Sequence, residues 1–290
     1  MSTACSQARY AHVIGDPVAH SRSPHIHRFW LERLGIAGGY SAHRVKMGEL
    51  ADYLASFRID ADWLGCNVTM PHKQAVIPLL DAVDPVAKAV GAVNTVIRQR
   101  DGRLKGYNTD VAGFLEPLTS ELAKAHLFRM ARILGTGGAA RAVMAGLAQN
   151  GVVLVLAGRN VNKAKQLIAD LAPQGQHHAV SLSHFADPTD FPFDDRKNCL
   201  DIIVNASPLG MRGQPELDFD FSHAPPGSIV YDIVTDPVET RFLKNARAAG
   251  FQTVDGYAML IGQAAAAFTY FFGERPPRHH DAELRDRLLS

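Results

Sequence analysis

Lys73 and Asp110 are two ionisable residues that stand in polar segments and could carry chemistry. Lys73 ends the segment Asn67-Val68-Thr69-Met70-Pro71-His72-Lys73, in which a strand is expected to end and Pro71 to begin a helix. A lysine in the first turn of a helix meets the positive end of the helix dipole, so it either extends into solvent or pairs with a carboxylate. Asp110, in Asn108-Thr109-Asp110, is one candidate partner. Such a pair could pass a proton to or from a substrate oxygen, although spacing alone does not bring the two residues together.

Smaller polar groups occur at three further points, and each has a structural alternative. Ser23 is expected to cap a helix whose first residue is Pro24, which leaves the neighbouring Ser21 unexplained. Two hydroxyls beside a helix start could hold a carboxylate or a diol. Asn94 is either a ligand donor or a residue of a turn or strand end. Gln263, alone in an apolar helix, is either a buried amide satisfied by the backbone or a ligand donor.

A glycine-rich turn is the strongest local signal for a ligand. The segment Leu134-Gly135-Thr136-Gly137-Gly138-Ala139-Ala140 follows an expected strand, opens an expected helix and fits the fingerprint G-x-G-x-x-A. Glycines there let the backbone turn tightly and approach a pyrophosphate at the helix N-terminus. The alternative is a turn that serves only packing. We expect a dinucleotide, held by Gly135, Gly137, Gly138 and Ala139.

The end of the next expected strand bears on which dinucleotide binds. An acidic residue there would bind the ribose 2′-hydroxyl of NAD, whereas a basic residue would accept the 2′-phosphate of NADP. The sequence reads Ala157-Gly158-Arg159-Asn160, without an acidic residue, and Arg159 can grip a phosphate through two hydrogen bonds. This pattern favours NADP over NAD as the cofactor. The alternative is that Arg159 is only a solvated surface residue.

Alternating strands and helices must position these residues. From residue 131 to 251, short apolar runs alternate with amphipathic ones, which predicts a parallel sheet flanked by helices. The strands are expected at Ile133–Leu134, Val152–Leu156, Ile202–Val204, Ile229–Asp232 and Thr253–Val254, and the helices at Gly137–Asn150 and Lys163–Leu171, the latter capped by Asn160. The first third mixes expected strands at Val13–Ile14, Tyr40–Val45 and Trp63–Val68 with a helix at Pro24–Leu34. The residues from 256 onward are expected to be helical.

Composition excludes several other classes of protein. The 290 residues, 47% apolar and 20% charged, are typical of a folded globular chain of one or two domains. The net charge of +1, without a basic run, argues against nucleic acid and anionic membrane as partners and favours a small molecule. Three dispersed cysteines and no metal-ligand spacing indicate a reducing compartment without a metal site. Residues 1–10 lack the apolar core of a secretory signal, and Met259–Phe272 is shorter than the ~20 residues that span a bilayer, so we expect a cytoplasmic protein.

Taken in order, seven motifs resemble the shikimate dehydrogenase family, and the likeness runs from about Tyr10 to Gly273. They are Ser21-Arg22-Ser23-Pro24, the Asn67–Lys73 segment, Gly91-Ala92-Val93-Asn94-Thr95, Gly106-Tyr107-Asn108-Thr109-Asp110, Gly135-Thr136-Gly137-Gly138-Ala139, Asn205-Ala206-Ser207-Pro208-Leu209-Gly210-Met211 and Gln263-Ala264. The resemblance implies an α/β fold of two domains with the active site between them. It implies a catalytic, substrate-binding domain over residues 1–111, with helices 256–290 packing back on it, and a Rossmann-type NAD(P)-binding domain over residues 112–255.

The resemblance also implies roles for single residues. Ser21 and Ser23 would bind the substrate carboxylate, and Lys73 and Asp110 would be the acid–base pair for hydride transfer between a nicotinamide and shikimate or 3-dehydroshikimate. The remaining positions would be Thr69, Asn94 and Gln263 at the substrate hydroxyls, and Arg159, Asn160, Ile233 and Gly256 at the cofactor, beside the glycine turn.

Two departures from the family pattern keep alternatives open. Thr235 stands where members commonly carry a tyrosine that helps to hold the carboxylate, and Gly158-Arg159-Asn160 stands where NADP-binding members often show Asn-Arg-Thr. Thr235 makes a dehydrogenase of quinate or another hydroxy acid an alternative, and the altered phosphate contacts leave NAD as the alternative cofactor. A catalytically silent protein that senses dinucleotides is an alternative of another class. A monomer or a homodimer is expected.

Overall fold

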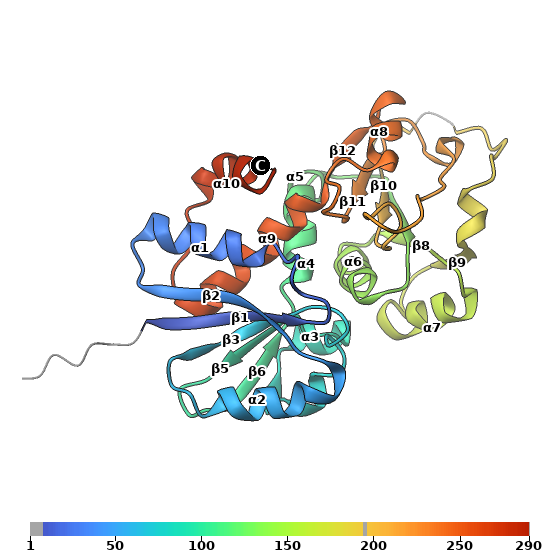
Figure 1. The fold of residues 1–290 in the computed structure, drawn as a ribbon. Helices are drawn as coiled ribbons and strands as arrows, with labels where there is room; N and C mark the ends of the chain where they lie inside the picture. Colours follow the sequence, from blue (N-terminus) through green and yellow to red (C-terminus); the bar gives the residue numbers. More distant parts are fainter. Residues whose placement is uncertain (1–7, 194–195, 290) are drawn as a thin grey trace, which may run out of the picture. The chain divides into compact units, whose positions relative to one another are not determined.

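The computed structural model describes residues 8–193 and 196–289, and the chain divides into two compact units (Figure 1). The first unit comprises Met1–Thr109 and Gln263–Ser290, and the second comprises Asp110–Gly262. Each unit contains its own six-stranded sheet with helices, so the predicted α/β class is confirmed. The predicted domain boundaries, after residues 111 and 255, stay predictions. Residues 1–7, which include Cys5 and most of the segment used to predict the location, lie outside the described residues.

The first unit has a mixed sheet. Its strands lie in the order β2-β1-β3-β5-β6-β4, and β5 runs antiparallel to both of its neighbours. The strands are β1 (Arg9–Gly15), β2 (Gly38–Arg44), β3 (Trp63–Val68), β4 (Ala82–Val83), β5 (Thr95–Arg98) and β6 (Leu104–Tyr107). The helices that begin in or reach this unit are α1 (Ser23–Leu34), α2 (Leu50–Arg58), α3 (Pro85–Val90), α9 (Gly256–Phe272) and α10 (Asp281–Leu289).

Side chains from successive residues of β1 enter two different cores, as the period of two in a strand requires. Val13 packs with Tyr40 of β2 and Phe271 of α9, whereas Ile14 packs with Leu54 of α2. Apolar side chains therefore cover both faces of this sheet.

His27 packs beside Tyr40 and Phe271, and it is a buried polar side chain without a hydrogen bond. Its exposed fraction is 0%, its ring stacks on Tyr40 with centroids 4.0 Å apart, and neither ring nitrogen has a hydrogen-bond partner. Burial lowers the pKa of His27 to about 3. Burial and the nearby His43 likewise lower the pKa of His12 to about 4. Both imidazoles must stay neutral in the folded chain.

Acidification is therefore expected to destabilise the chain, and His27→Phe to weaken that effect. A histidine whose pKa is lowered on folding contributes stability above its unfolded pKa of about 6.5, and this contribution is lost as the pH falls toward the folded value. Phenylalanine keeps the stacked ring and removes two unpaired nitrogens, each of which costs about 1–3 kcal/mol when buried. We expect the urea midpoint to drop less between pH 7.5 and pH 5 in the variant. An equal drop in both proteins would contradict this explanation.

The second unit has an entirely parallel sheet in the order β12-β11-β10-β7-β8-β9. The strands are β7 (Phe128–Leu134), β8 (Val153–Gly158), β9 (His178–Ser181), β10 (Cys199–Asn205), β11 (Ile229–Asp232) and β12 (Gln252–Val254). The helices are α4 (Asp110–Leu115), α5 (Thr119–Leu122), α6 (Gly138–Gln149), α7 (Val161–Leu171) and α8 (Arg241–Ala248). This is the doubly wound order, in which the direction of winding reverses between β7 and β10, and ligands bind at the carboxyl ends of the strands at that point. The predicted parallel sheet is confirmed.

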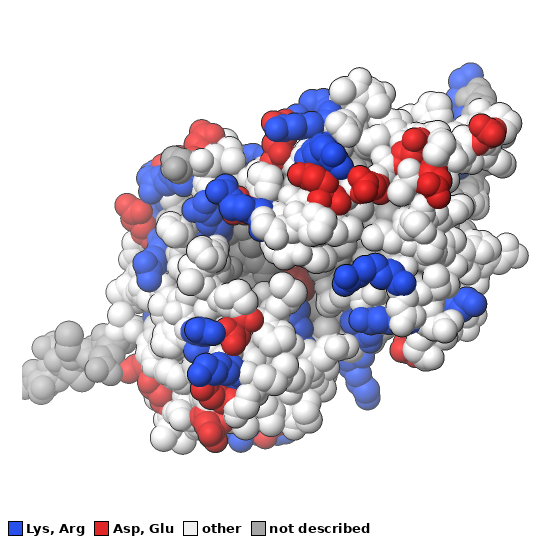
Figure 2. All heavy atoms as spheres, turned by 45° about the vertical axis from the view of Figure 1, so that its right-hand side comes forward, with Lys and Arg blue, Asp and Glu red and all other residues white. Residues whose placement is uncertain are grey.

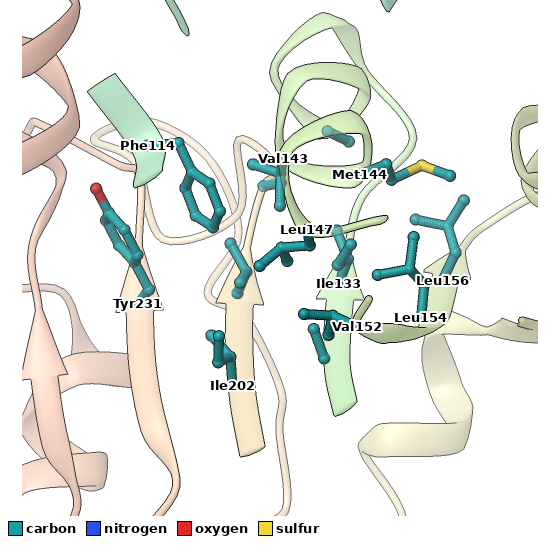
Figure 3. Close-up of a cluster of buried hydrophobic side chains, with 14 of the residues drawn as sticks. Phe114, Ile133, Val143, Met144, Leu147, Val152, Leu154, Leu156, Ile202 and Tyr231 are labelled. Carbon is teal, nitrogen blue, oxygen red and sulfur yellow. The ribbon is translucent and has the colours of Figure 1, made fainter. Parts of the chain in front are cut away.

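Buried apolar side chains from helix α6 and from the strands form the main core of the second unit (Figure 3). Val143 and Leu147 recur at helical spacing on α6 and face Ile133 of β7. Beside them, the ring of Phe114 stacks on Tyr231, with centroids 5.0 Å apart. The next residue of β7, Leu134, belongs to a second core of this unit, on the opposite face of the sheet.

Six short 3-10 helices complete the described elements: η1 (Met47–Glu49), η2 (Ile77–Leu79), η3 (Glu116–Leu118), η4 (Leu182–Phe185), η5 (Phe221–His223) and η6 (Arg278–His280). None of the helices in the described ranges is both long and apolar enough to cross a membrane. The face in Figure 2 carries basic and acidic side chains interspersed. Residues 8–193 and 196–289 contain no group of three or more His, Cys, Asp or Glu side chains that could hold a metal ion.

Candidate active site

The segment that carries Lys73 is a series of turns, so the predicted helix starting at Pro71 is wrong. Residues 71–76 are turns, and only the short η2 follows. The backbone carbonyl of Lys73 accepts a hydrogen bond from Val93 N at 2.8 Å, and Ile77 N bonds instead to Gln74 O at 3.2 Å. A helix would have required the Lys73 carbonyl for Ile77. No helix dipole therefore opposes the charge of Lys73 at this position. The contact with Val93 ties the lysine segment to the strand that follows Asn94.

Asn94 is the centre of a buried polar network in the first unit. Its exposed fraction is 3%. The Asn94 Oδ1 accepts hydrogen bonds from Thr109 N at 2.7 Å and from Thr95 Oγ1 at 3.1 Å. The Asn94 Nδ2 donates to Thr109 Oγ1 at 2.9 Å and to Gln263 Oε1 at 3.5 Å. The structure thus brings together two of the predicted substrate residues, Asn94 and Gln263, although they are 169 positions apart in the sequence.

Asn67 and Tyr40 belong to the same network, although neither was predicted as a site residue. Asn67 Nδ2 donates to Thr95 Oγ1 at 2.9 Å, and Tyr40 Oη donates to Asn67 Oδ1 at 2.5 Å. Burial raises the pKa of Tyr40 well above its usual value, and Ser23 acts in the opposite direction. The available signal was Asn67 itself, because a polar residue in a strand that is otherwise buried and apolar requires a partner.

Ser21 and Ser23 lie together at the start of α1, but not as predicted. Arg22 occupies the N-cap position without a side-chain cap, and Ser23 is the first residue of the helix, so the prediction that Ser23 is the cap is wrong. Ser23 N donates to Ser21 Oγ at 3.3 Å, which explains part of the role of Ser21. Ser23 is buried and Ser21 is half-buried. The two serines thus lie together at the start of α1, and their binding of a carboxylate stays a prediction.

Thr69 lies at the end of strand β3, and Asp110 lies at the beginning of helix α4. Thr69 follows β3 directly, is half-buried, and its backbone N donates to Ile14 O at 2.9 Å. Asp110 is buried and is the first residue of α4, next to the Thr109 that bonds Asn94. Lys73 belongs to the first unit and Asp110 to the second. Their pairing stays a prediction.

The glycine turn of the second unit joins β7 to α6. Gly135 has φ +128°, a conformation that side chains rarely adopt, and a Cβ there would lie 2.6 Å from Ala206 O. Gly137 is exposed, a Cβ on it would meet no atom within 4 Å, and no side chain caps α6. Gly138 and Ala139 form the first turn of that helix. The amide groups of this turn are accessible to an anion, so these residues fit the pyrophosphate of a dinucleotide.

Arg159 and Asn160 follow β8, the strand beside β7. Both are exposed. Asn160 Oδ1 accepts a hydrogen bond from Lys163 N at 3.1 Å, so the predicted cap of α7 is confirmed. Arg159 directly follows the end of β8, and its contact with a ribose substituent stays a prediction.

Ile233, Thr235 and Gly256 lie beyond the carboxyl end of β11. Gly256 is buried at the start of α9, and a Cβ on it would overlap the Val234 carbonyl oxygen and lie 2.7 Å from Ile233 O. Only glycine permits this approach of α9 to the loop. Ile233 N donates to Asn205 O at 3.1 Å, and Thr235 is half-buried. The structure therefore brings Ile233 and Gly256 together, as the cofactor prediction requires.

The doubly wound sheet with its glycine turn defines the class of dinucleotide-binding α/β proteins. Comparison with known proteins narrows this class. Residues 13–96 match the model of the shikimate dehydrogenase substrate binding domain, and residues 256–282 match that of the shikimate 5′-dehydrogenase C-terminal domain. A shikimate dehydrogenase (NADP(+)) of Sphingopyxis alaskensis is 47% identical over 284 residues, which cover 97% of each chain.

Solved structures agree with these matches. A shikimate 5-dehydrogenase of Thermus thermophilus, in complex with NADP(H) and shikimate, has a TM-score of 0.82 and 33% identity, covering 97% of this chain and 100% of that chain. A quinate dehydrogenase of Corynebacterium glutamicum in complex with NAD has a TM-score of 0.82 and 32% identity, covering 97% and 99%. The chain belongs to the shikimate dehydrogenase family.

Proposed function

We propose that this chain transfers a hydride reversibly between NADP and shikimate, with 3-dehydroshikimate as the oxidised product. The observation that carries this function is similarity over nearly the whole chain to curated NADP-dependent shikimate dehydrogenases, at 47% and 41% identity for two of them. The chain is accordingly an NADP-dependent oxidoreductase. The glycine turn, with its open first turn of α6, supports the cofactor assignment.

We assign the proton transfer to Lys73 and Asp110. Oxidation of a hydroxyl requires that its proton leaves as the hydride leaves the same carbon, and reduction requires the reverse. The Lys73 amine would take up or donate that proton at the substrate oxygen, and its positive charge would stabilise a developing alkoxide. The Asp110 carboxylate would orient the lysine and favour its charged form.

The remaining polar residues of the first unit would hold the substrate. Ser21 and Ser23 are proposed to bind the carboxylate, and Thr69, Asn94 and Gln263 the ring hydroxyls. The hydrogen bonds of Asn94 to Thr109 and Thr95 fix its amide before any substrate arrives, which favours binding in one orientation. Thr235, in the second unit, is proposed to replace the carboxylate contact of the usual tyrosine with a shorter hydroxyl.

The cofactor would be held by the glycine turn, by Ile233 and Gly256, and by Arg159 and Asn160. When bound, NADP supplies or accepts the hydride. Gly135, Gly137, Gly138 and Ala139 would contact the pyrophosphate through the backbone. Arg159 would bind the 2′-phosphate, which NAD lacks.

Replacing Arg159 by alanine is expected to weaken use of NADP selectively. A charge-assisted hydrogen bond contributes about 1.5–3 kcal/mol, so the KM for NADP should rise by about 10-fold or more. The KM for NAD should change little, which makes NAD the internal control. Steady-state kinetics with both cofactors measure this difference. Equal changes with NADP and NAD would refute the assignment of Arg159 to the phosphate.

Quinate is the substrate that most needs to be compared with shikimate, because a quinate dehydrogenase is among the similar structures. The curated relatives favour shikimate, and neither quinate nor a catalytically silent sensor is favoured. Measuring kcat/KM for the two acids at saturating NADP tests the substrate. We expect shikimate to be preferred, and a preference for quinate would overturn the substrate assignment while leaving the reaction class intact. The cytoplasmic location and the monomeric or homodimeric state stay predictions.

A further inference from the structure

Asp232, the last residue of β11, is a buried carboxylate outside the proposed catalytic pair. Its exposed fraction is 0%. Asp232 Oδ1 accepts hydrogen bonds from Asn205 Nδ2 at 2.9 Å and Val234 N at 3.0 Å, and Oδ2 accepts one from Thr240 Oγ1 at 2.7 Å. Among the described residues, no lysine, arginine or histidine forms an ion pair with it. Three neutral donors alone stabilise its charge.

The burial of Asp232 opposes its charged form. Burial raises the pKa of Asp232 to about 6, although the bonds from Thr240, Val234 and Asn205 act in the opposite direction. A buried carboxylate without a cationic partner is costly compared with an apolar side chain of similar size. A buried ionisable group with a shifted pKa is therefore a candidate for a functional role.

The first donor connects Asp232 to the loop after β10. The same Asn205 Nδ2 also donates to Leu209 O at 2.9 Å, and Asn205 Oδ1 accepts from Ser207 Oγ at 2.7 Å. Between these residues, Ala206 N donates to Leu134 O at 2.9 Å, and Ala206 O lies where a Cβ on Gly135 would clash. The orientation of Asn205 therefore sets the backbone that packs against the glycine turn.

The other two donors connect Asp232 to the loop after β11 and to α8. Val234 N bonds the carboxylate, and the carbonyl of the same residue lies against Gly256. Thr240 Oγ1 donates to Asp232 while it accepts from Leu243 N at 3.3 Å as the cap of α8. One carboxylate thus joins three segments at the carboxyl edge of the sheet, where a doubly wound fold binds its dinucleotide.

We propose that Asp232 is a positioning residue for the NADP site, which acts by fixing the loops 205–210 and 233–235 against the glycine turn. The inference rests on the proposed function, because it takes NADP as the ligand. Asparagine at this position keeps the shape of the side chain but turns one acceptor into a donor. It cannot accept the hydrogen bond from Thr240 Oγ1, and its neutral oxygen holds Asn205 Nδ2 and Val234 N less strongly than the carboxylate does, so the anchors of both loops weaken.

The test measures NADP binding by calorimetry at pH 8 for the unmodified chain, Asp232→Asn and Asp201→Asn. Asp201 is the matched control, because it is 4% exposed in the same sheet and pairs with Arg132 at 3.2 Å and Arg196 at 2.9 Å. We expect Asp232→Asn to raise the Kd for NADP by about 10-fold or more, since displacements of about 1 Å at a binding site have effects of this size. The KM for shikimate should change much less. Asp201→Asn should lower the urea midpoint while the Kd for NADP stays within about 2-fold, because its effect is on stability.

A second pair of variants covers the case in which Asp232→Asn does not fold. Thr240→Val removes both the donor to Oδ2 and the cap of α8, and it is expected to raise the Kd for NADP as Asp232→Asn does. Thr240→Ser keeps the hydroxyl and should retain the Kd of the unmodified chain. Unchanged NADP binding in the folded Asp232→Asn or Thr240→Val variant would overturn this inference alone. An equal weakening in Asp201→Asn would also overturn it, because a loss of stability would then be the cause. Failure of the unmodified chain to bind NADP would overturn the cofactor assignment together with this inference.

Discussion

Replacing Lys73 by methionine is expected to lower kcat for shikimate oxidation by about 10²-fold or more, with little change in KM. Methionine keeps much of the length of the side chain and removes the amine. General acid–base catalysis typically contributes about 10²–10⁴-fold, and a group that acts only in the transition state affects kcat and kcat/KM equally. Steady-state kinetics at saturating NADP measure this effect.

The control for Lys73→Met is Lys105→Met, at another half-buried lysine of the first unit, whose Nζ lies 4.9 Å from the centre of the Tyr107 ring. This variant should keep the kcat of the unmodified chain. Asp110→Asn should lower kcat in the same direction as Lys73→Met, because the lysine loses the carboxylate that orients it. Turnover that survives intact in Lys73→Met would refute the acid–base role.

Replacing Gly135 by alanine is expected to abolish useful NADP binding and to destabilise the second unit. A side chain at φ +128° costs on the order of 1–3 kcal/mol, and a Cβ 2.6 Å from Ala206 O forces the loop after β10 to move. The Kd for NADP should rise by about 100-fold or more, and the urea midpoint should fall. Calorimetry and urea unfolding measure the two effects separately.

Gly137→Ala separates contact with the cofactor from damage to the fold. A Cβ at Gly137 would meet no protein atom within 4 Å, so the stability should be unchanged. The added methyl group would enter the space before α6 and should still weaken NADP binding. A Gly135→Ala protein with normal stability and normal NADP binding would show that the turn does not serve the cofactor.

Much of the framework could be predicted, because local patterns determine it. Two strands, Trp63–Val68 and Ile229–Asp232, have the same bounds in the structure as those predicted from the sequence. The helix expected at Gly137–Asn150 was found at Gly138–Gln149, because its apolar residues recur at helical spacing and Asn150-Gly151 ends the run. The short β5 and β6 were not listed, since their four residues give little periodicity and their antiparallel pairing depends on partners elsewhere in the sheet.

The contacts that decide the site were less predictable, because they are distant in the sequence. Nothing near Pro71 reveals that Val93 N would take the Lys73 carbonyl and prevent a helix. Asn94 and Gln263 could each be singled out as unexplained amides, but only the fold places them within a hydrogen bond of each other. The environment of Asp232 is of the same kind, since Asn205 and Thr240 reach it from two other segments.

The most direct test of the central claim follows the absorbance of reduced nicotinamide after shikimate and NADP are mixed with the purified chain. Lys73→Met serves as the matched blank, and NAD and quinate serve as the alternative reactants. With shikimate, we expect NADPH to form from NADP faster than NADH forms from NAD. In Lys73→Met, we expect NADPH to form at least about 100-fold more slowly than in the unmodified chain. Absence of NADPH formation with shikimate, from a protein that is folded and binds NADP, would contradict the central claim.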